Sequence, residues 1–303
     1  MKKLYFIVLV FFLIFSSTGC AYVEIDSSTT GNISSGELRV FYFDVGQGDS
    51  IYIRTPNGDD ILIDAGDNHY GDEVVNYLKE LEVDDIEVLI ATHPHSDHIG
   101  GLDVVLDNFV VESVYAPRVS HTTKSYEDFL LAVADQGIKI KTAKAGVELP
   151  LDGVSAKFIG PAAEYDDLNN WSAALHLVYG DTSFIFAGDA EEHAELDILA
   201  NNRNIQADVY KVGHHGSNSS SSDEFLSAVN PEYAVISVGT DNRYGHPHKE
   251  ALDKFIDLGI KVLRTDLDGT ILFTSDGSSI EYSTIQDSKF KWTSSANAEH
   301  RYY

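Results

Sequence analysis

The sequence predicts an α/β protein in which two mixed β-sheets pack face to face with helices on the outside, an αββα sandwich. Two observations predict this fold. Short β-rich runs bounded by Gly, Pro and Asp alternate with segments whose apolar residues recur at helical spacing. This order occurs once in each half of the chain, with meander strands followed by strand–helix units. The 303 residues, 43% of them hydrophobic, suffice for one such domain with a real core.

The first half of the domain begins at Leu38 with three short β-rich runs, which is typical of a meander. The segment 72–81 carries its valines and leucines at helical spacing, and the largely apolar run 86–92 predicts a buried strand. We expect strands at 38–45, 51–55, 61–66, 86–92 and 111–117, and helices at 72–81, 101–109 and 124–136.

The second half repeats this order and ends in three further strands. We expect strands at 156–161, 173–180, 183–189, 207–213 and 232–239, helices at 191–201, 222–229 and 249–259, and closing strands in the segments KVLRT, TILFT and SIEYS. The domain is therefore expected to span 37–284. The polar residues 285–303 are expected to form a loose tail.

The N-terminus has the pattern of a secretory signal: a basic start, a short apolar run, and small residues that end at Cys20. The run is shorter than the roughly 20 residues of a membrane-spanning helix. The segment is similar to a bacterial lipobox, with Ser17 in place of the usual Leu. We expect 1–20 to direct export and Cys20 to carry the lipid, with an uncleaved signal anchor as the alternative. Residues 21–36 predict a flexible linker, so the domain is expected on the extracellular face of the cell membrane or secreted.

The charge of the chain narrows the possible partners. There are 48 acidic and 21 basic residues, for a formal net charge of −27. Such a surface repels polyanions, so we expect no extended groove for duplex DNA, and solubility or a salty medium accounts for the acidity. Cys20 is the only cysteine, which excludes an intrachain disulfide and a metal site of paired thiolates. The sequence does not indicate an oligomeric state.

The segment THPHSDHIGG (92–101) carries the chemistry. Three imidazoles and a carboxylate fall within six residues, between a buried strand and a helix. Alternate residues of an extended turn share a face, so the first two histidines point the same way and the residues after them reach a second point nearby. Burying these groups is costly unless a metal satisfies them, and zinc, manganese or iron accepts such ligands. The candidate ligands are His93, His95, Asp97 and His98.

This pattern resembles the signature of the metallo-β-lactamase superfamily, and the resemblance extends over residues 38 to about 283. It implies the αββα fold of that superfamily. Asp64 matches an aspartate that precedes the first helix, and we expect it to orient a ligand histidine. Asp189 matches the carboxylate that bridges two metals, although alone it would suit a helix N-cap.

A set of segments in the same order narrows the resemblance to the ComEC-like subgroup, the extracellular domain of DNA-uptake proteins. The membrane-channel region of those proteins is missing from this sequence, so a role in DNA translocation is not implied. The segments are DVGQGDS (44–50), ILIDAG (61–66), HPHSDHIGG (93–101), NNWS (169–172), KVGHHGS (211–217) and YGHP (244–247).

The resemblance also bears on the remaining ligands. The usual third histidine of the first metal is replaced here by Asn169 and Asn170, so His214 or His215 must take its place. Adjacent residues of an extended chain point opposite ways, so we expect only one of the two to bind metal. The expected ligands are His93, His95, Asp189 and His214 for the first ion and Asp97, His98, Asp189 and His246 for the second, with His215 and Asn170 lining the site.

The expected function is a hydrolase with two divalent ions, zinc or manganese with iron as an alternative, that hold a bridging hydroxide. Asp97, Asp189 and His215 are the expected catalytic residues. Lys211 and Arg243 could hold a phosphate, although ordinary solvation explains them equally well. The expected substrate is a small or polymeric phosphodiester. A lactonase, thioesterase or β-lactamase activity and a non-catalytic binding module are the alternatives. His121 lies outside any motif and is expected at the surface, as are His69, His193 and His300.

Overall fold

The computed structural model describes residues 36–202, 204–285 and 292–294, all within one unit of the chain, Ser35–Tyr303. The expected signal segment with Cys20 and nearly all of the expected linker lie outside the described residues. Among the helices that are described, none combines the length and the apolar character needed to cross a membrane.

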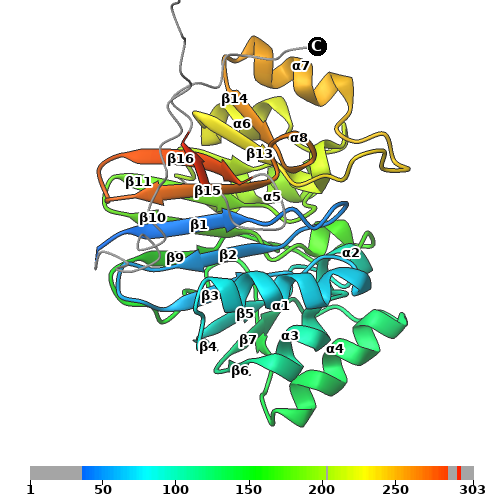
Figure 1. Cartoon of the computed structure of the whole chain (residues 1–303). Coiled ribbons are helices and arrows are strands. Elements are labelled where there is room, and N and C mark those ends of the chain that lie inside the picture. The colour runs from blue at the N-terminus through cyan, green and yellow to red at the C-terminus, as the bar shows by residue number, and fades with distance from the viewer. Residues whose placement is uncertain (1–35, 203, 286–291, 295–303) are drawn as a thin grey trace, which may run out of the picture. The chain divides into compact units, whose positions relative to one another are not determined.

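The first sheet has nine strands and is built from both ends of the domain (Figure 1). Strands β1 to β3 form the expected antiparallel meander, and β5, β7 and β8 follow in parallel. In sheet order the strands are β17 (Trp292–Ser294), β16 (Ile280–Ile285), β15 (Thr270–Ser275), β1 (Leu38–Tyr42), β2 (Ile51–Arg54), β3 (Asp60–Ile63), β5 (Val88–Ile90), β7 (Val114–Ala116) and β8 (Lys141–Thr142).

The second sheet has six strands, of which β11 to β14 are parallel and β9 to β11 antiparallel. In sheet order they are β14 (Lys261–Arg264), β13 (Tyr233–Ile236), β12 (Val209–Lys211), β11 (Thr182–Phe186), β10 (Leu175–Tyr179) and β9 (Ser155–Phe158). A small parallel pair, β4 (Asp85–Ile86) and β6 (Val110–Val111), lies apart from both.

Three apolar cores separate four layers. Along β1, Val40 and Tyr42 belong to the core between the sheets, whereas Phe41 belongs to the core under α1, α3 and α4, as the two-residue period of a strand requires. The third core joins the second sheet to α5, α6 and α7. The αββα sandwich is therefore confirmed (Figure 1). The helices are α1 (Gly71–Glu80), α2 (Ser96–Ile99), α3 (Leu102–Asn108), α4 (Lys124–Asp135), α5 (Glu192–Asn201), α6 (Asp223–Val229), α7 (Lys249–Asp257) and α8 (Thr265–Asp268).

Capping side chains set the ends of several helices. Thr123 accepts a hydrogen bond from the backbone N–H of Tyr126 at the start of α4, and Ser222 accepts one from Phe225 at the start of α6. Helix α6 ends at Asn230, which adopts the left-handed conformation that asparagine tolerates. These local signals explain why the expected helices begin and end close to their predicted residues.

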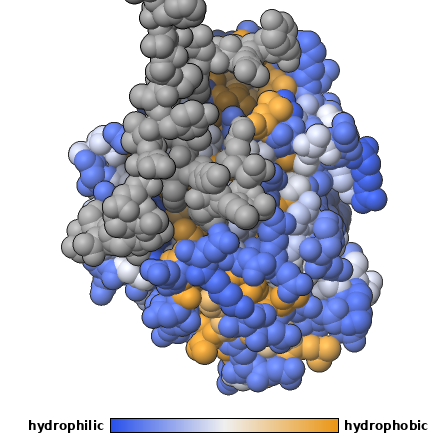
Figure 2. Space-filling view, viewed as in Figure 1, coloured by the Kyte–Doolittle hydropathy of each residue, from blue (hydrophilic) through white to orange (hydrophobic). Residues whose placement is uncertain are grey.

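The three closing strands belong to different sheets. Strand β14 is the edge strand of the second sheet, whereas β15 and β16 belong to the first. β17 pairs with β16 and lies within the stretch 285–303, which the sequence predicted as a polar tail. Figure 2 shows that hydrophilic residues predominate on the viewed face, in keeping with the large excess of acidic residues.

Candidate metal centre

The expected site residues meet where parallel strands of both sheets end. Strands β3 and β5 are parallel in the first sheet, and β11, β12 and β13 are parallel in the second. The segments that leave the carboxyl ends of these strands carry Asp64, the 93–98 motif, Asp189 and His215. Loops at the carboxyl ends of parallel strands are the usual place for a site in such sheets.

Asp189 lies at the centre of the cluster. Its Oδ2 is 3.2 Å from His98 Nε2 and 3.7 Å from His93 Nε2, and its Oδ1 is 3.5 Å from His215 Nε2. His215 Nε2 is also 3.5 Å from Asp97 Oδ2. The ligand atoms of His93, His98 and Asp189 lie within 4.8 Å of one another, and so do those of Asp97, His98 and His215. His98 belongs to both groups, and the cluster as a whole is suited to hold metal.

His95 stands at the edge of this cluster. Its Nδ1 is 3.0 Å from His93 Nε2, and its half-buried ring lines the adjoining pocket. It is outside the two tightly spaced groups. His95 therefore borders the cluster beside His93, where the cluster adjoins the pocket.

Hydrogen bonds behind the rings fix which nitrogen faces the cluster. His98 Nδ1 is 2.8 Å from Asp64 Oδ2, and Asp64 also accepts hydrogen bonds from Thr92 N at 2.8 Å and Thr92 Oγ1 at 2.5 Å. His215 Nδ1 is 2.9 Å from the carbonyl oxygen of Ser237, to which it can only donate. Both rings therefore donate through Nδ1 and turn Nε2 toward the cluster, and Asp64 takes the orienting position expected of it.

The charges in the cluster oppose one another. Burial lowers the pKa of His98, but Asp189 and Asp49 outweigh burial and hold that pKa well above its ordinary value. The same balance of burial against carboxylates raises the pKa of His215 to about 9. Burial raises the pKa of Asp189, but the surrounding imidazoles hold it well below its usual range. Protons on the imidazoles thus supply positive charge that a divalent cation would supply instead.

Unpartnered polar atoms show that the donor set fits a metal. His98 Nε2, His215 Nε2 and Asp189 Oδ1 are buried and have no hydrogen-bond partner among the described residues. Buried polar atoms nearly always have a hydrogen-bond partner, so the lack of one at these three atoms indicates that they bind a ligand. Imidazole nitrogen and carboxylate oxygen suit zinc, manganese or iron.

His214 and His215 exchange the roles expected for them. His215 is buried and belongs to the cluster, whereas His214 lines the pocket, with 3.1 Å between His214 Nδ1 and Glu191 Oε1. The expectation assumed an extended chain, but the φ angles of His214 and His215 are 47° and 54° in a tight turn. The sequence pattern contains no signal for this turn other than the flanking glycines.

The two asparagines also differ from expectation. Asn170 Oδ1 accepts hydrogen bonds from the backbone N–H groups of Glu191 and Ala194, so it caps α5 and does not line the site. Asn169 lines the pocket instead, and its buried Oδ1 has no described partner. The two asparagines are adjacent in the chain, and the sequence alone does not predict which of them faces the pocket when the geometry of the turn is unknown.

The two expected phosphate contacts have different outcomes. The Lys211 side chain is fully buried and its Nζ lies 2.5 Å from Asp49 Oδ2, so Lys211 is out of reach of a substrate. Arg243 is exposed, and its guanidinium carbon lies 4.9 Å from the centre of the Tyr244 ring, which lines the pocket. Arg243 therefore remains a candidate for substrate contact.

A pocket of ≈ 280 Å³ opens above the cluster. His246 lines it, with its ring centroid 6.4 Å from that of His215, and is absent from the tightly spaced ligand groups. Its buried Nδ1 has no hydrogen-bond partner among the described residues, and the expected role of His246 as a ligand of the second ion stays a prediction. His121 and Thr123 also line the pocket, and His121, which was expected at the surface, is half-buried there. Gln47 completes the rim from the DVGQGDS segment.

Sequence reasoning missed Asp49, which is buried behind the cluster. Its Oδ1 is 3.4 Å from His215 Nδ1, and its Oδ2 is 3.7 Å from His98 Nδ1. Burial raises its pKa, but Lys211 and the two imidazoles outweigh burial and lower it to about 2. The DVGQGDS pattern was the available signal, since two glycines before a carboxylate predict a tight turn.

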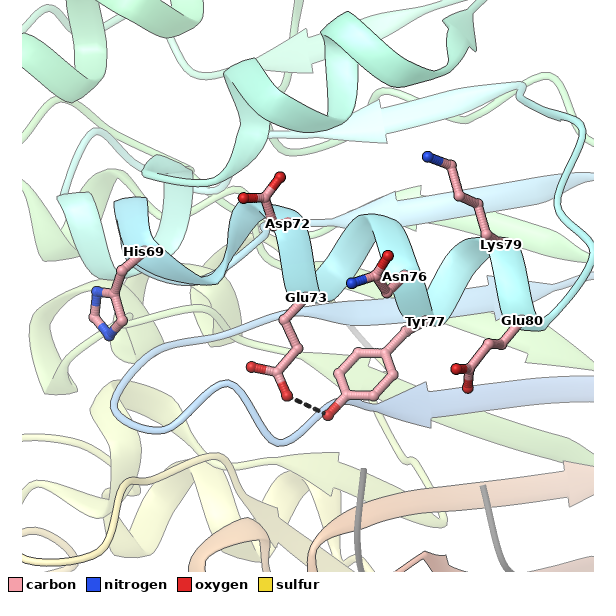
Figure 3. A pocket seen from close by; sticks show the side chains of 7 residues that line it. All are labelled: His69, Asp72, Glu73, Asn76, Tyr77, Lys79 and Glu80. Carbon is pink, nitrogen blue, oxygen red and sulfur yellow. Dashed lines mark hydrogen bonds between the residues drawn. The ribbon is translucent and has the colours of Figure 1, made fainter. Parts of the chain in front are cut away.

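A second hollow lies along α1 and is separate from this centre (Figure 3). Its volume is ≈ 550 Å³, and its side chains, from α1 and from His69 just before it, do not converge on a point. Tyr77 donates a hydrogen bond to Glu73 at 2.8 Å, which satisfies the carboxylate locally. The hollow has no feature of a chemical site.

Known proteins of this architecture match the chain. The family profile described as the Metallo-beta-lactamase superfamily covers residues 43–240. ComE operon protein 3 of Bacillus subtilis (strain 168) is 33% identical over 257 residues, which cover 79% of this chain and 33% of the relative. Competence protein ComA of Neisseria gonorrhoeae is 31% identical over 263 residues, covering 86% of this chain and 36% of the relative. The chain spans about a third of the length of these relatives.

A solved structure agrees at the level of fold. The metallo-beta-lactamase fold protein YhfI from Bacillus subtilis aligns with a TM-score of 0.52 at 10% identity, covering 78% of this chain and all of the other. The family profile, the competence-protein relatives and the αββα layers point the same way. The chain therefore belongs to the metallo-β-lactamase superfamily, in its ComEC-like subgroup.

Proposed function

We propose that this chain is a hydrolase that binds two divalent metal ions and cleaves phosphodiester bonds. The observation that carries the proposal is the convergence of three buried, unpartnered ligand atoms, His98 Nε2, His215 Nε2 and Asp189 Oδ1. Ligands on both sides of one carboxylate suit a pair of ions that share it. Membership of the metallo-β-lactamase superfamily supports the same chemistry.

The chain's own residues hold and orient such a pair. Bound divalent ions supply Lewis acidity and lower the pKa of water to near neutrality. Asp64 and the Ser237 carbonyl keep two of the ligand rings in place from behind. Zinc, manganese and iron all accept this donor set. We assign His93, His95 and Asp189 to one ion, and Asp97, His98, His215 and Asp189 to the other.

The pocket favours a phosphodiester over a bulky neutral substrate. At ≈ 280 Å³ it has room for a phosphate with one small substituent, and a longer polymer would continue outside. Arg243, held against Tyr244 at the mouth, offers a guanidinium that matches the geometry of phosphate oxygens. The net charge of −27 disfavours a long duplex, so contact with a polymer would be confined to the site.

A substrate panel tests this proposal. Protein lacking residues 1–20 would be assayed with added zinc or manganese on bis-p-nitrophenyl phosphate, p-nitrophenyl phosphorylcholine, labelled single-stranded DNA and nitrocefin. We expect turnover of the phosphodiesters. Cleavage of nitrocefin alone would contradict the phosphodiester assignment. Absence of both turnover and bound metal would support a non-catalytic binding module.

A matched pair of histidine variants tests the site. His95→Ala should abolish turnover and reduce the metal content of the purified protein. His193→Ala is the control, because its side chain is 74% exposed on α5 and does not line the pocket. Equal turnover and metal content in the two variants would refute the assignment.

We also propose that the domain acts outside the cell, tethered through a lipid on Cys20. The support is the sequence of the first 20 residues, with its basic start, apolar run and terminal cysteine. Expression of Cys20→Ala in a bacterial host should move the protein from the membrane fraction to the soluble exported fraction. An unchanged membrane fraction would indicate an uncleaved anchor instead.

A further inference from the structure

An ion pair that the proposed chemistry does not use lies behind the metal centre. Lys211 Nζ is 2.5 Å from Asp49 Oδ2, and the two side chains are 0% and 2% exposed. Among the lysines and arginines that the structure describes, only Lys211 and Arg54 are buried. Arg54 pairs with Asp60 between β2 and β3 and has no residue of the centre among its partners.

Such a pair is a poor device for stability alone. Removing two charges from water costs several kcal/mol per ion, and a buried pair often gives no net stability over an apolar replacement. A lysine in this position is costlier still, because its ammonium is the most strongly hydrated of the basic groups. The contacts of the pair point to another role.

Asp49 lies between the two histidines that donate through Nδ1. Its Oδ1 is 3.4 Å from His215 Nδ1 and its Oδ2 is 3.7 Å from His98 Nδ1, on the sides of the rings that face away from the cluster. Lys211 Nζ donates to the carbonyl oxygen of Gly188 at 3.3 Å, one residue before Asp189. The ion pair therefore lies behind three proposed ligands: Asp49 is next to His98 and His215, and Lys211 bonds the residue before Asp189.

The pair also joins the two halves of the site. Asp49 comes from the loop before β2, and its backbone N–H donates to the carbonyl oxygen of Asp97 at 3.1 Å. Gly48 makes this approach possible, because a Cβ there would lie 2.2 Å from the same oxygen. Lys211 ends β12 of the second sheet. The pair therefore fixes the two ligand-bearing loops to each other as well as to the rings.

We propose that Asp49 and Lys211 are positioning residues that hold His98 and His215 for the second ion and so determine how tightly that ion is bound. Lys211 keeps the Asp49 carboxylate in place between the rings and offsets its charge. This inference rests on the proposed function only in that the centre binds metal.

The test removes both charges together, so that neither is left buried alone. The double variant Asp49→Leu with Lys211→Met is compared with the control double variant Asp60→Leu with Arg54→Met, which removes a buried pair elsewhere. Metal affinity is measured by competition with a chromophoric chelator, metal content by mass spectrometry, and ligand geometry by the visible spectrum of the cobalt-substituted protein. Unfolding in urea is followed for each variant without metal.

We expect the dissociation constant of the more weakly held ion to rise roughly 10- to 100-fold in the Asp49/Lys211 variant, as for other residues that orient ligands. The cobalt spectrum should change with it. The control should keep wild-type affinity and spectrum whatever its stability. Should the double variant fail to fold, the near-isosteric double variant Asp49→Asn with Lys211→Met gives the same comparison, again without a charge left buried alone.

Three results are decisive. Wild-type affinity and cobalt spectrum in either folded Asp49/Lys211 double variant would overturn the inference and leave an ordinary buried ion pair. An equal loss of affinity in the control would overturn it too, by tracing the effect to stability. A wild-type protein that binds no metal would instead refute the proposed function, so the two failures are distinguishable.

Discussion

Replacing Asp64 by Asn tests whether the position of one proton on His98 governs metal binding. Asp64 is fully buried, accepts two hydrogen bonds from Thr92 and lies 2.8 Å from His98 Nδ1. Its φ of 58° is left-handed, a conformation that asparagine tolerates as well as aspartate does. The substitution therefore keeps the backbone and the side-chain shape, and changes one acceptor oxygen into a donor NH2 group.

The structure gives the size of the effect. Thr92 N can still donate to the amide oxygen, but the new Nδ2 meets Thr92 Oγ1 and His98 Nδ1, which both donated before. Two hydrogen bonds to a carboxylate, about 1.5 to 3 kcal/mol each, give way to one neutral bond of about 1 kcal/mol. The net loss in the free energy of unfolding is about 2 to 5 kcal/mol. His98 can accept from Nδ2 only by moving its proton to Nε2, which faces the cluster, so metal affinity should fall roughly 10- to 100-fold.

Urea unfolding of the metal-free protein and chelator competition measure the two losses. Asp276→Asn is the control, because this exposed carboxylate accepts hydrogen bonds only from the turn residues Ser278 and Ser279 and lies far along the chain from the centre. Its metal affinity should match wild type. Undiminished metal affinity in Asp64→Asn would refute the proton argument.

Three further outcomes follow from the same geometry. Removal of metal held at a hundred times its dissociation constant should lower the free energy of unfolding by about 3 kcal/mol, seen as a lower Tm by calorimetry, and an unchanged Tm would contradict a folded-state metal site. Burial and the neighbouring imidazoles lower the pKa of His246 in the metal-free protein to about 4. The unfolded state therefore binds a proton at this histidine between about pH 6.5 and 4, whereas the folded state does not. Stability should fall as the pH drops through this window, and His246→Gln should flatten the decline; an NMR titration of His246 near pH 6.5 would contradict this. Arg243→Ala should raise KM for phosphodiesters while the free energy of unfolding stays within about 0.5 kcal/mol of wild type, with an unaltered KM in steady-state kinetics as the opposing result.

The four layers of the fold and the 93–98 motif at the metal centre could be predicted from the sequence. Periodicity distinguishes strands from helices when each has one buried face, as Val40 and Phe41 show by entering different cores. The 93–98 motif could be recognised because its four candidate ligands fall within six residues and follow one buried strand. Local patterns of this kind depend on few assumptions about the rest of the fold.

Turn geometry limited what could be predicted beyond this. His214 and His215 both have positive φ, which reverses the side-chain directions expected of an extended chain. Asn169 lines the pocket in place of Asn170 for a related reason, because a short 3-10 turn directs Asn169 to the pocket and Asn170 to α5. The contacts of the His214–His215 turn are to residues distant in the chain, such as Gly188 and Ser237, so the local sequence does not define its geometry.

The ion pair between Asp49 and Lys211 could not be predicted from the sequence either. Lys211 was expected to reach a phosphate because it is close in sequence to the ligands, yet it ends β12 with its side chain inside the protein. Its partner Asp49 lies 162 positions earlier in the chain, as their residue numbers show. A pairing over that distance is visible only once both sheets are in place.

The pairing of β1 with β15 has a consequence for how this domain folds. Leu38 is opposite Ser275, so the first strand of the domain pairs with a strand that lies 237 positions later in the chain, as the residue numbers show. Pairings between segments so far apart form slowly, because the long intervening chain must be ordered first. The centre of the nine-stranded sheet therefore cannot assemble until residues near 275 have been synthesised, which favours slow, late folding.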